Sequence, residues 1–139
     1  LIEGYLVGPG ADLTGANFTN ADLSYAVLTD TNLTGAEFTD ANLSFVKSGN
    51  ITGTPAVLPT DWRLIEGYLV GPGADLTGAN LNNADLTNMF LYFANFTNAD
   101  LTDVTWTGAT CPDLTIVDGA TVTSCCGHLN GATPAAGCP

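Results

Sequence analysis

The chain has 139 residues, and its 14 acidic and 2 basic residues give it a net charge of −12 at pH 7. This balance argues against binding to nucleic acid or to an anionic membrane through charge. No run approaches the roughly 18 apolar residues that a membrane span needs. The composition therefore predicts one domain of ordinary size with no membrane span.

The first ten residues, LIEGYLVGPG, read as a strand that ends in a Gly-Pro-Gly turn. Glycine and proline together are typical of tight turns, so we expect this turn to lead the chain into the repeats that follow. The sequence starts at Leu1, and no signal peptide is visible in it. We expect a secreted protein from which such a segment has been removed.

Seven five-residue units follow in residues 11–45: ADLTG-ANFTN-ADLSY-AVLTD-TNLTG-AEFTD-ANLSF. A large apolar residue recurs at every fifth position, with a small residue two places before it. A period of five fits neither a helix nor a strand. The pattern predicts a chain that turns a corner every five residues, so that four units close one coil. The large residues then point inward: Leu13, Phe18, Leu23, Leu28, Leu33, Phe38 and Leu43.

This pattern resembles that of the pentapeptide-repeat family, A(D/N)LXX, over residues 11–45 and 74–108. The resemblance implies an all-β fold, a right-handed quadrilateral β-helix. Because the coils have 20 residues, we expect Leu13 to stack with Leu33 and Phe18 with Phe38. Each coil buries about four large side chains, and stability comes from stacking, since one coil cannot hide them alone.

A longer repeat lies over the short one, because residues 1–17 recur unchanged as residues 64–80. The offset of 63 residues equals three 20-residue coils plus three. We therefore expect residues 50–73 to form another coil with a three-residue insertion in GTPAVLPTD, and residues 64–70 to form a strand. The prediction is one continuous solenoid at 1–124, with super-repeats 1–63 and 64–126, six to seven coils, and a cap or tail at 125–139.

The residue before each inward position alternates between acid and amide down a column. The pairs one coil apart are Asp12 with Asn32, Asn17 with Glu37, Asp22 with Asn42, Asp75 with Asn95, and Asn80 with Asp100. Two carboxylates at strand spacing would repel, whereas an amide can donate a hydrogen bond to a carboxylate. Drift between residues of similar shape is the alternative interpretation.

All four cysteines lie near the C-terminus: Cys111, Cys125, Cys126 and Cys138. An even number in a glycine-rich segment favours disulfides and an oxidising compartment. The neighbours Cys125 and Cys126 form a strained ring if paired together, so we expect them to pair with Cys111 and Cys138, in either order. A metal site is the alternative, but His128 is the only histidine and no C-x2-C pair exists.

Aromatic residues break the repeat rule at MFLYF, residues 89–93. Only Met89 and Leu91 fit inward positions there, which leaves Phe90, Tyr92 and Phe93 facing out. Tyr25 and Phe45 also face out, one coil apart. Clustered exposed aromatics often mark an interface, and local packing under the linker loop is the alternative explanation.

No catalytic, cofactor-binding or metal-binding motif is present, so we expect no enzyme and no cofactor. The first functional hypothesis is a secreted structural subunit, a homo-oligomer that polymerises head to tail. An open solenoid has a bare strand edge at each tip, and heterologous contacts that do not close give filaments. The residues at the first tip are Leu1, Ile2 and Tyr5.

Two other hypotheses remain open. Some pentapeptide-repeat proteins mimic DNA and inhibit DNA gyrase, and this chain is acidic. Its charge density falls short of the one per roughly 1.7 Å on duplex DNA, and the only expected acidic stripe combines Glu37, Asp40, Asp100 and Asp103. Ice or glycan binding by threonine arrays is the third hypothesis, resting on the T-x-T pairs 29/31, 52/54, 105/107 and 121/123.

Overall fold

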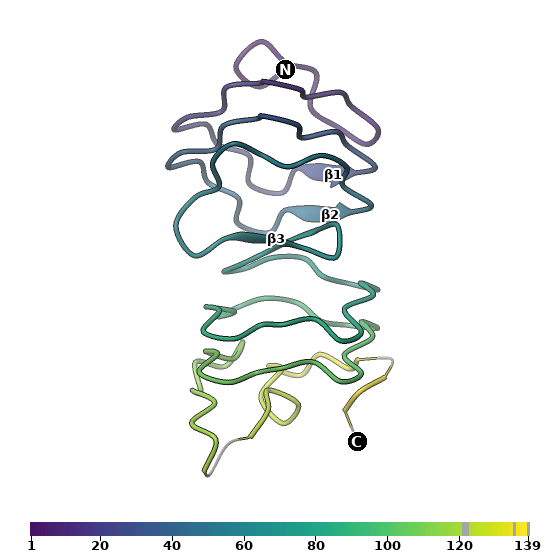
Figure 1. Ribbon diagram of the computed structural model, residues 1–139, viewed down its shortest axis with the longest axis vertical. Coiled ribbons are helices and arrows are strands. Elements are labelled where there is room, and N and C mark those ends of the chain that lie inside the picture. The colour runs from purple at the N-terminus through teal and green to yellow at the C-terminus, as the bar shows by residue number, and fades with distance from the viewer. Residues whose placement is uncertain (121–122, 135, 139) are drawn as a thin grey trace.

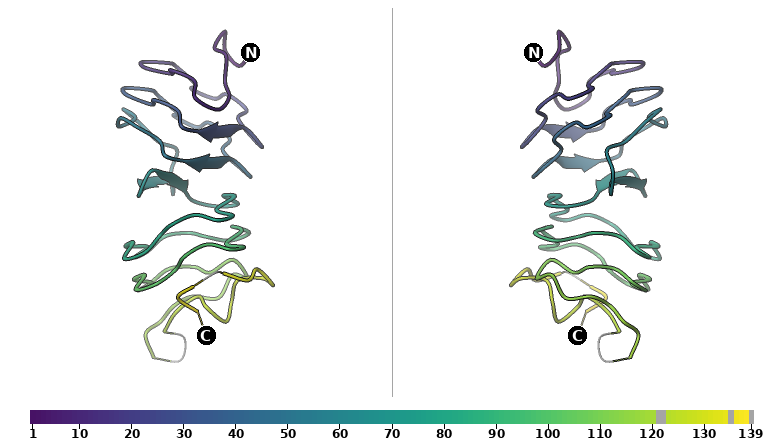
Figure 2. Two further views of the ribbon diagram at one scale, coloured as in Figure 1. Left: turned by 90° about the vertical axis from the view of Figure 1, so that its right-hand side faces the viewer. Right: turned by 90° about the vertical axis from the view of Figure 1, so that its left-hand side faces the viewer.

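A computed structural model describes residues 1–139 except 121, 122, 135 and 139. The molecule is an elongated stack of coils, with the N-terminus at one end and the C-terminus at the other (Figures 1 and 2). None of the described residues is helical. The fold is an all-β solenoid in which each coil runs beside the previous one.

The repeat period sets the register of the stack. Parallel bridges join residues 20 apart on successive sides of the coil: Asp12 to Asn32, Asn17 to Glu37, and Asp22 to Asn42. The fourth side pairs β1 (Val27–Thr29) with β2 (Lys47–Gly49) in the same parallel register. The expected 20-residue coil with a corner every five residues is therefore confirmed in the first block.

The large residue of each unit fills the interior, as the period predicts. Leu13, Phe18, Leu23 and Leu28 are all at most 1% exposed. The Phe18 and Phe38 rings stack with centroids 5.2 Å apart. Met89 and Leu91 are also buried, which agrees with the inward positions expected for them. The core is thus a set of columns along the axis, each side chain packed on its counterpart one coil away.

Each corner is a tight turn whose hydrogen bonds are local. The Ala16 N–H donates to the Leu13 carbonyl at 3.0 Å, and Gly15 between them has a φ of 65°. That arrangement is a type II turn, which requires a left-handed residue at its third position. The side chain before the inward residue supports the turn as well, since the Thr14 N–H donates to Asp12 Oδ1 at 3.1 Å.

The linker between the two blocks contains an antiparallel hairpin. Strand β3 (Arg63–Ile65) pairs with β4 (Tyr68–Val70), with Leu64 opposite Leu69, and the turn lies at Glu66 and Gly67. The expectation of one strand over residues 64–70 was wrong, because Glu66 and Gly67 both have positive φ angles, 49° and 78°, that reverse the chain. The Glu-Gly pair is a hairpin turn signal that the strand interpretation passed over.

The hairpin makes the insertion longer than expected and turns the second block. Lys47 bridges Asp75, 28 residues on, which is one 20-residue coil plus eight; the expected insertion of three was wrong. Asp75 therefore lies on the side of Val27 and Lys47, and not on that of Asp12. Within the second block the stacking is as expected, with Asp75 beside Asn95 and Asn80 beside Asp100.

The last coil is covered by the chain that follows it. Thr110 ends the regular register by bridging Phe90, and the chain then reverses so that Thr110 also pairs with Ile116 in antiparallel fashion. Further on, Ala136 bridges Asp100. The covering segment thus starts near residue 113, earlier than the expected boundary at 125.

Candidate interaction surfaces

The two copies of the 17-residue repeat fold alike but have different surroundings. In the N-terminal copy, Ile2 and Tyr5 form the antiparallel bridge that Ile65 and Tyr68 form in the second. Ile2, Tyr5 and Val7 pack on the first coil, and Tyr5 lies 5.3 Å from Phe18 between ring centroids. Of the tip residues expected at an interface, Leu1 is exposed, while Ile2 and Tyr5 are partly buried.

Leu6 was missed by the sequence argument and is the most informative residue of this tip. It is 79% exposed, whereas its counterpart Leu69 is fully buried. The Leu69 N–H donates to Ser48 Oγ at 2.8 Å, and the Gly67 carbonyl accepts from the Ile51 N–H at 3.1 Å. Both contacts come from the coil that precedes the second hairpin, and none of the described residues provides them to the first.

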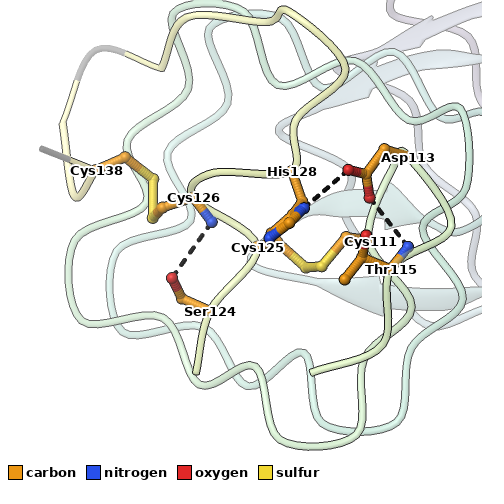
Figure 3. Close-up of a disulfide and its surroundings, with 8 residues drawn as sticks. All are labelled: Cys111, Asp113, Thr115, Ser124, Cys125, Cys126, His128 and Cys138. Carbon is orange, nitrogen blue, oxygen red and sulfur yellow. Dashed lines mark hydrogen bonds and ion pairs between the residues drawn. A yellow bond between two sulfur atoms is a disulfide. The ribbon is translucent and has the colours of Figure 1, made fainter. Parts of the chain in front are cut away.

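The C-terminal tip is held by two disulfides, Cys111–Cys125 and Cys126–Cys138 (Figure 3). Each bridge joins one of the vicinal cysteines to an outer one, within the two pairings that the sequence left open. Tail carbonyls accept hydrogen bonds from the last coils: Val117 from the Gly108 N–H, Thr133 from Asn98 and Ala136 from Leu101. The donors that another coil would need at this tip are therefore occupied by the tail.

His128 belongs to this cap. Its Nδ1 lies 2.8 Å from Asp113 Oδ2, and its carbonyl accepts from the Asp113 N–H at 3.3 Å (Figure 3). Desolvation raises the pKa of Asp113, but hydrogen bonds from Thr115 and His128 outweigh it and leave that pKa below its ordinary value. Among the described residues, no group of three or more acidic, histidine or cysteine side chains is arranged to hold a metal ion. The pair therefore fastens the tail.

Three of the outward aromatics share one corner of the solenoid. The Tyr25 N–H donates to the Ser44 carbonyl and the Phe45 N–H to the Gly73 carbonyl. The Gly73 N–H then donates to the Tyr92 carbonyl, beside Phe93. The levels of this corner are thus Tyr25, Phe45, Gly73 and Phe93, which we name the aromatic corner. All four have φ angles between 59° and 70°.

The aromatic corner is exposed and partly stacked. Tyr25, Phe45 and Phe93 are 70%, 44% and 59% exposed. The Tyr25 and Phe45 rings stack at 4.9 Å, and Tyr92 meets Phe93 edge-on at 6.0 Å. Phe90 is separate from them, since it bridges Thr110 on a side of the coil.

A groove of about 410 Å³ opens at the Gly73 level of the aromatic corner. Its lining includes Phe45, Trp62, Tyr92 and Phe93, with the carboxylates of Asp40 and Asp61. Trp62 packs on both core clusters, and a side chain at Gly71 would collide with its indole. The sequence argument missed Trp62 and Gly73, because it assigned the linker to a regular coil.

The acidic and threonine arrays considered from sequence do not line up. Glu37 lies in the column of Asn17 and Val57, whereas Asp100, one corner after Asn95, falls on the side of Asp12 and Asn32. The expected stripe of Glu37, Asp40, Asp100 and Asp103 is therefore split between sides, because the eight-residue insertion shifts the second block by one corner. Thr52 and Thr105 likewise stand in different columns, and Thr121 lies outside the described residues.

Comparisons with known proteins agree with the coil register. The sequence model of pentapeptide repeats matches residues 11–44 and 73–108, in eight copies. A comparison with curated proteins finds no match, and no helix in the described part of the chain is long and apolar enough to cross a membrane.

Among solved structures, the chain is similar to HetL from the cyanobacterium Nostoc sp. strain PCC 7120, described as a pentapeptide repeat protein involved in heterocyst differentiation regulation. The identity is 31% and the TM-score 0.32, and the match covers 76% of this chain and 40% of HetL. The chain thus spans less than half of HetL. With half of its residues in matched repeats and a 20-residue register through both blocks, the chain belongs to the pentapeptide-repeat family.

Proposed function

We propose that this chain is a non-enzymatic structural protein of an oxidising, extracellular environment, and that it forms the closed end of a longer β-solenoid assembly. In this proposal the tube is right-handed and four-sided, the C-terminal tip is sealed by the tail, and the N-terminal tip receives a coil of the same kind. The observation that carries the proposal is the contrast between exposed Leu6 and buried Leu69 in identical sequence.

The internal junction serves as a template for what the N-terminal tip binds. At that junction the preceding coil offers a small buried residue, Ser48, whose hydroxyl accepts from the Leu69 N–H. The same coil bridges Lys47 to Asp75 beyond the hairpin. A coil with these features, placed over the N-terminal tip, would bury Leu6 and Val7 as Leu69 and Val70 are buried. Burying a leucine contributes about 1.5–3 kcal/mol.

The sealed C-terminal tip changes the head-to-tail prediction. Polymerisation head to tail needs two open tips, and the tail carbonyls of Val117, Thr133 and Ala136 already accept from the last coils. The oxidised chain is therefore suited to end a stack. Two disulfides in the tail support an oxidising compartment.

The test is to extend the chain at its N-terminus with a second copy of residues 11–63, so that a coil and its linker precede Leu1. We expect one cooperative unfolding transition at a higher temperature than for the unextended chain, because neighbouring coils stabilise each other. The Leu6 amide should gain protection from hydrogen exchange comparable to that of Leu69. Two independent transitions with an unprotected Leu6 amide would refute the proposal.

Leu6→Asp supplies the control. Leu6 is exposed in the unextended chain, so the substitution should leave that chain folded with nearly unchanged stability. In the extended chain it places an unpaired carboxylate in the new junction and should separate the transitions. Leu114→Asp, at an exposed leucine of the C-terminal cap, is the matched substitution that should have no such effect.

A further inference from the structure

We propose that the groove of the aromatic corner binds an organic ammonium cation, held between the Phe45 and Phe93 rings at the level of Gly73. This binding site is independent of the assembly surface at the N-terminal tip. It rests on the arrangement of the rings, on the space that Gly73 leaves between them, and on the charge around the groove.

The aromatic residues stand where the backbone disfavours them. Other corners of the repeats use glycine, asparagine or aspartate at the left-handed position, as Gly15, Asn20 and Asp30 show. A bulky residue there is an outlier that costs about 1–3 kcal/mol. Tyr25, Phe45 and Phe93 occupy it on one corner alone and remain 44–70% exposed. Since their burial does not offset this cost, the corner is a candidate for a binding role.

Gly73 interrupts the ladder of rings and leaves one ring face free. Tyr25 covers one face of Phe45, with an interplanar angle of 17°. The opposite face looks along the axis toward the Gly73 level, where a Cβ atom would lie 4.0 Å from Phe45 Cε1. Because glycine has no side chain, the space there forms the groove, which Phe93 borders one level further on.

The spacing and the charge fit a cation. Phe45 and Phe93 are two coils apart, which is about 10 Å at strand spacing. A cation midway lies about 5 Å from each ring, within the roughly 6 Å over which cation–π attraction operates. A flat neutral ring would leave a gap, since stacked carbons prefer about 3.5–4.0 Å. The lining carboxylates, Asp40 and Asp61, and the net charge of −12 attract a cation and repel an anion.

The test is a titration of the full oxidised chain, followed by NMR, with choline and with its neutral isostere 3,3-dimethyl-1-butanol. We expect saturable shifts at the Phe45, Trp62 and Phe93 rings with choline, and binding of the neutral isostere weaker by about tenfold or more. A peptide with one trimethyl-lysine is the second probe, which distinguishes a protein-borne cation from a free one. Equal binding of the isostere, or the absence of saturable binding by both cationic probes, would overturn the proposal.

Gly73→Asn fills the space with a residue that tolerates the left-handed conformation and should weaken choline binding by about tenfold. Gly78→Asn is its matched control, since Gly78 has a similar φ of 72° and open space around it. Phe45→Leu should weaken binding, whereas Phe90→Leu, at an equally exposed ring outside the groove, should not. Equal losses in the test and control variants would mean general attraction to an acidic surface, and would refute the site.

Discussion

The residue that closes each five-residue unit sets the shape of the corner. It lies in the left-handed region throughout the repeats, for instance at Asn20, Asp40, Asn83 and Asn98. Glycine enters that region freely, and asparagine and aspartate enter it more readily than other residues. The sequence carries this signal, because most units end in one of these three types. It would have marked Tyr25, Phe45 and Phe93 as exceptions at equivalent positions.

Gly78→Ala should destabilise the protein by about 1 kcal/mol, because an L-residue pays for the φ of 72° while its methyl group meets nothing within 4 Å. Gly8→Ala, also in open space but outside the left-handed region, should be close to neutral. Urea denaturation of both variants measures the difference. Equal free energies of unfolding would show that the corner conformation carries no cost.

The side chains before the inward residues act on the same corners. Hydrogen bonds from Thr14, Ser24, Thr87 and Thr102 lower the pKa values of Asp12, Asp22, Asp85 and Asp100 respectively. The amide partners contribute in two ways. Asn42 donates directly to Asp22 at 3.1 Å. Asn32 instead donates to Thr14 Oγ1, which donates to Asp12, so hydrogen bonding contributes to the alternation of acid and amide.

These pKa values predict acid sensitivity. A carboxyl group with a lowered folded-state pKa stabilises the fold above its unfolded value, near 3.8, and loses that contribution as the pH falls through the folded value. Stability should therefore be nearly level between neutral pH and about pH 5 and fall below about pH 4. In Asp22→Asn the fall should be shallower. Urea denaturation across this range measures it, and a stability that rises steadily toward pH 2 would contradict the prediction.

At the scale of elements, the sequence predicted the coils well and the junction poorly. A strict period repeated fourteen times leaves one register in which Phe18 stacks on Phe38 and Leu76 on Phe96. The linker has no such period. Its hairpin, β3 and β4, is apolar on both faces because coils cover it from both sides, so alternation could not reveal it. The groove depends on Trp62 and Gly73 of this linker and was missed with it.

The ring columns should be the most sensitive part of the core. Phe38 is fully buried and stacks on Phe18, so Phe38→Ala should cost about 3–5 kcal/mol through lost transfer energy and the cavity left behind. Phe38→Leu should cost less. Phe90→Ala, at a partly exposed ring, is the control and should cost far less. Thermal and urea unfolding measure these differences, and similar values at both rings would contradict the assignment of Phe38 to the core.

At the scale of the whole molecule, the two tips are unlike. The N-terminal hairpin leaves Leu1 and Leu6 in solvent, while the C-terminal tail covers the last coil and is fastened at Cys125 and Cys126. Neither closure was visible in the repeat pattern, because tail packing follows from pairings between non-repeating residues. The cysteine count indicated a pinned tail, but not that its carbonyls complete the hydrogen bonds of the coil edge.

Reduction of the tail should convert a closed end into an open one. The two bridges close segments with separations of 14 and 12 residues, and each such loop contributes about 3 kcal/mol by constraining the unfolded tail. Without them, release of residues 113–138 frees the donors of Asn98, Leu101 and Gly108. That edge can then pair with the N-terminal tip of a second molecule, a heterologous contact that does not close. We expect sedimentation to show concentration-dependent association only in reductant, and Leu6→Asp to suppress it. Association of the oxidised chain, or reduced association that Leu6→Asp leaves unchanged, would mean that the tail does not gate this tip.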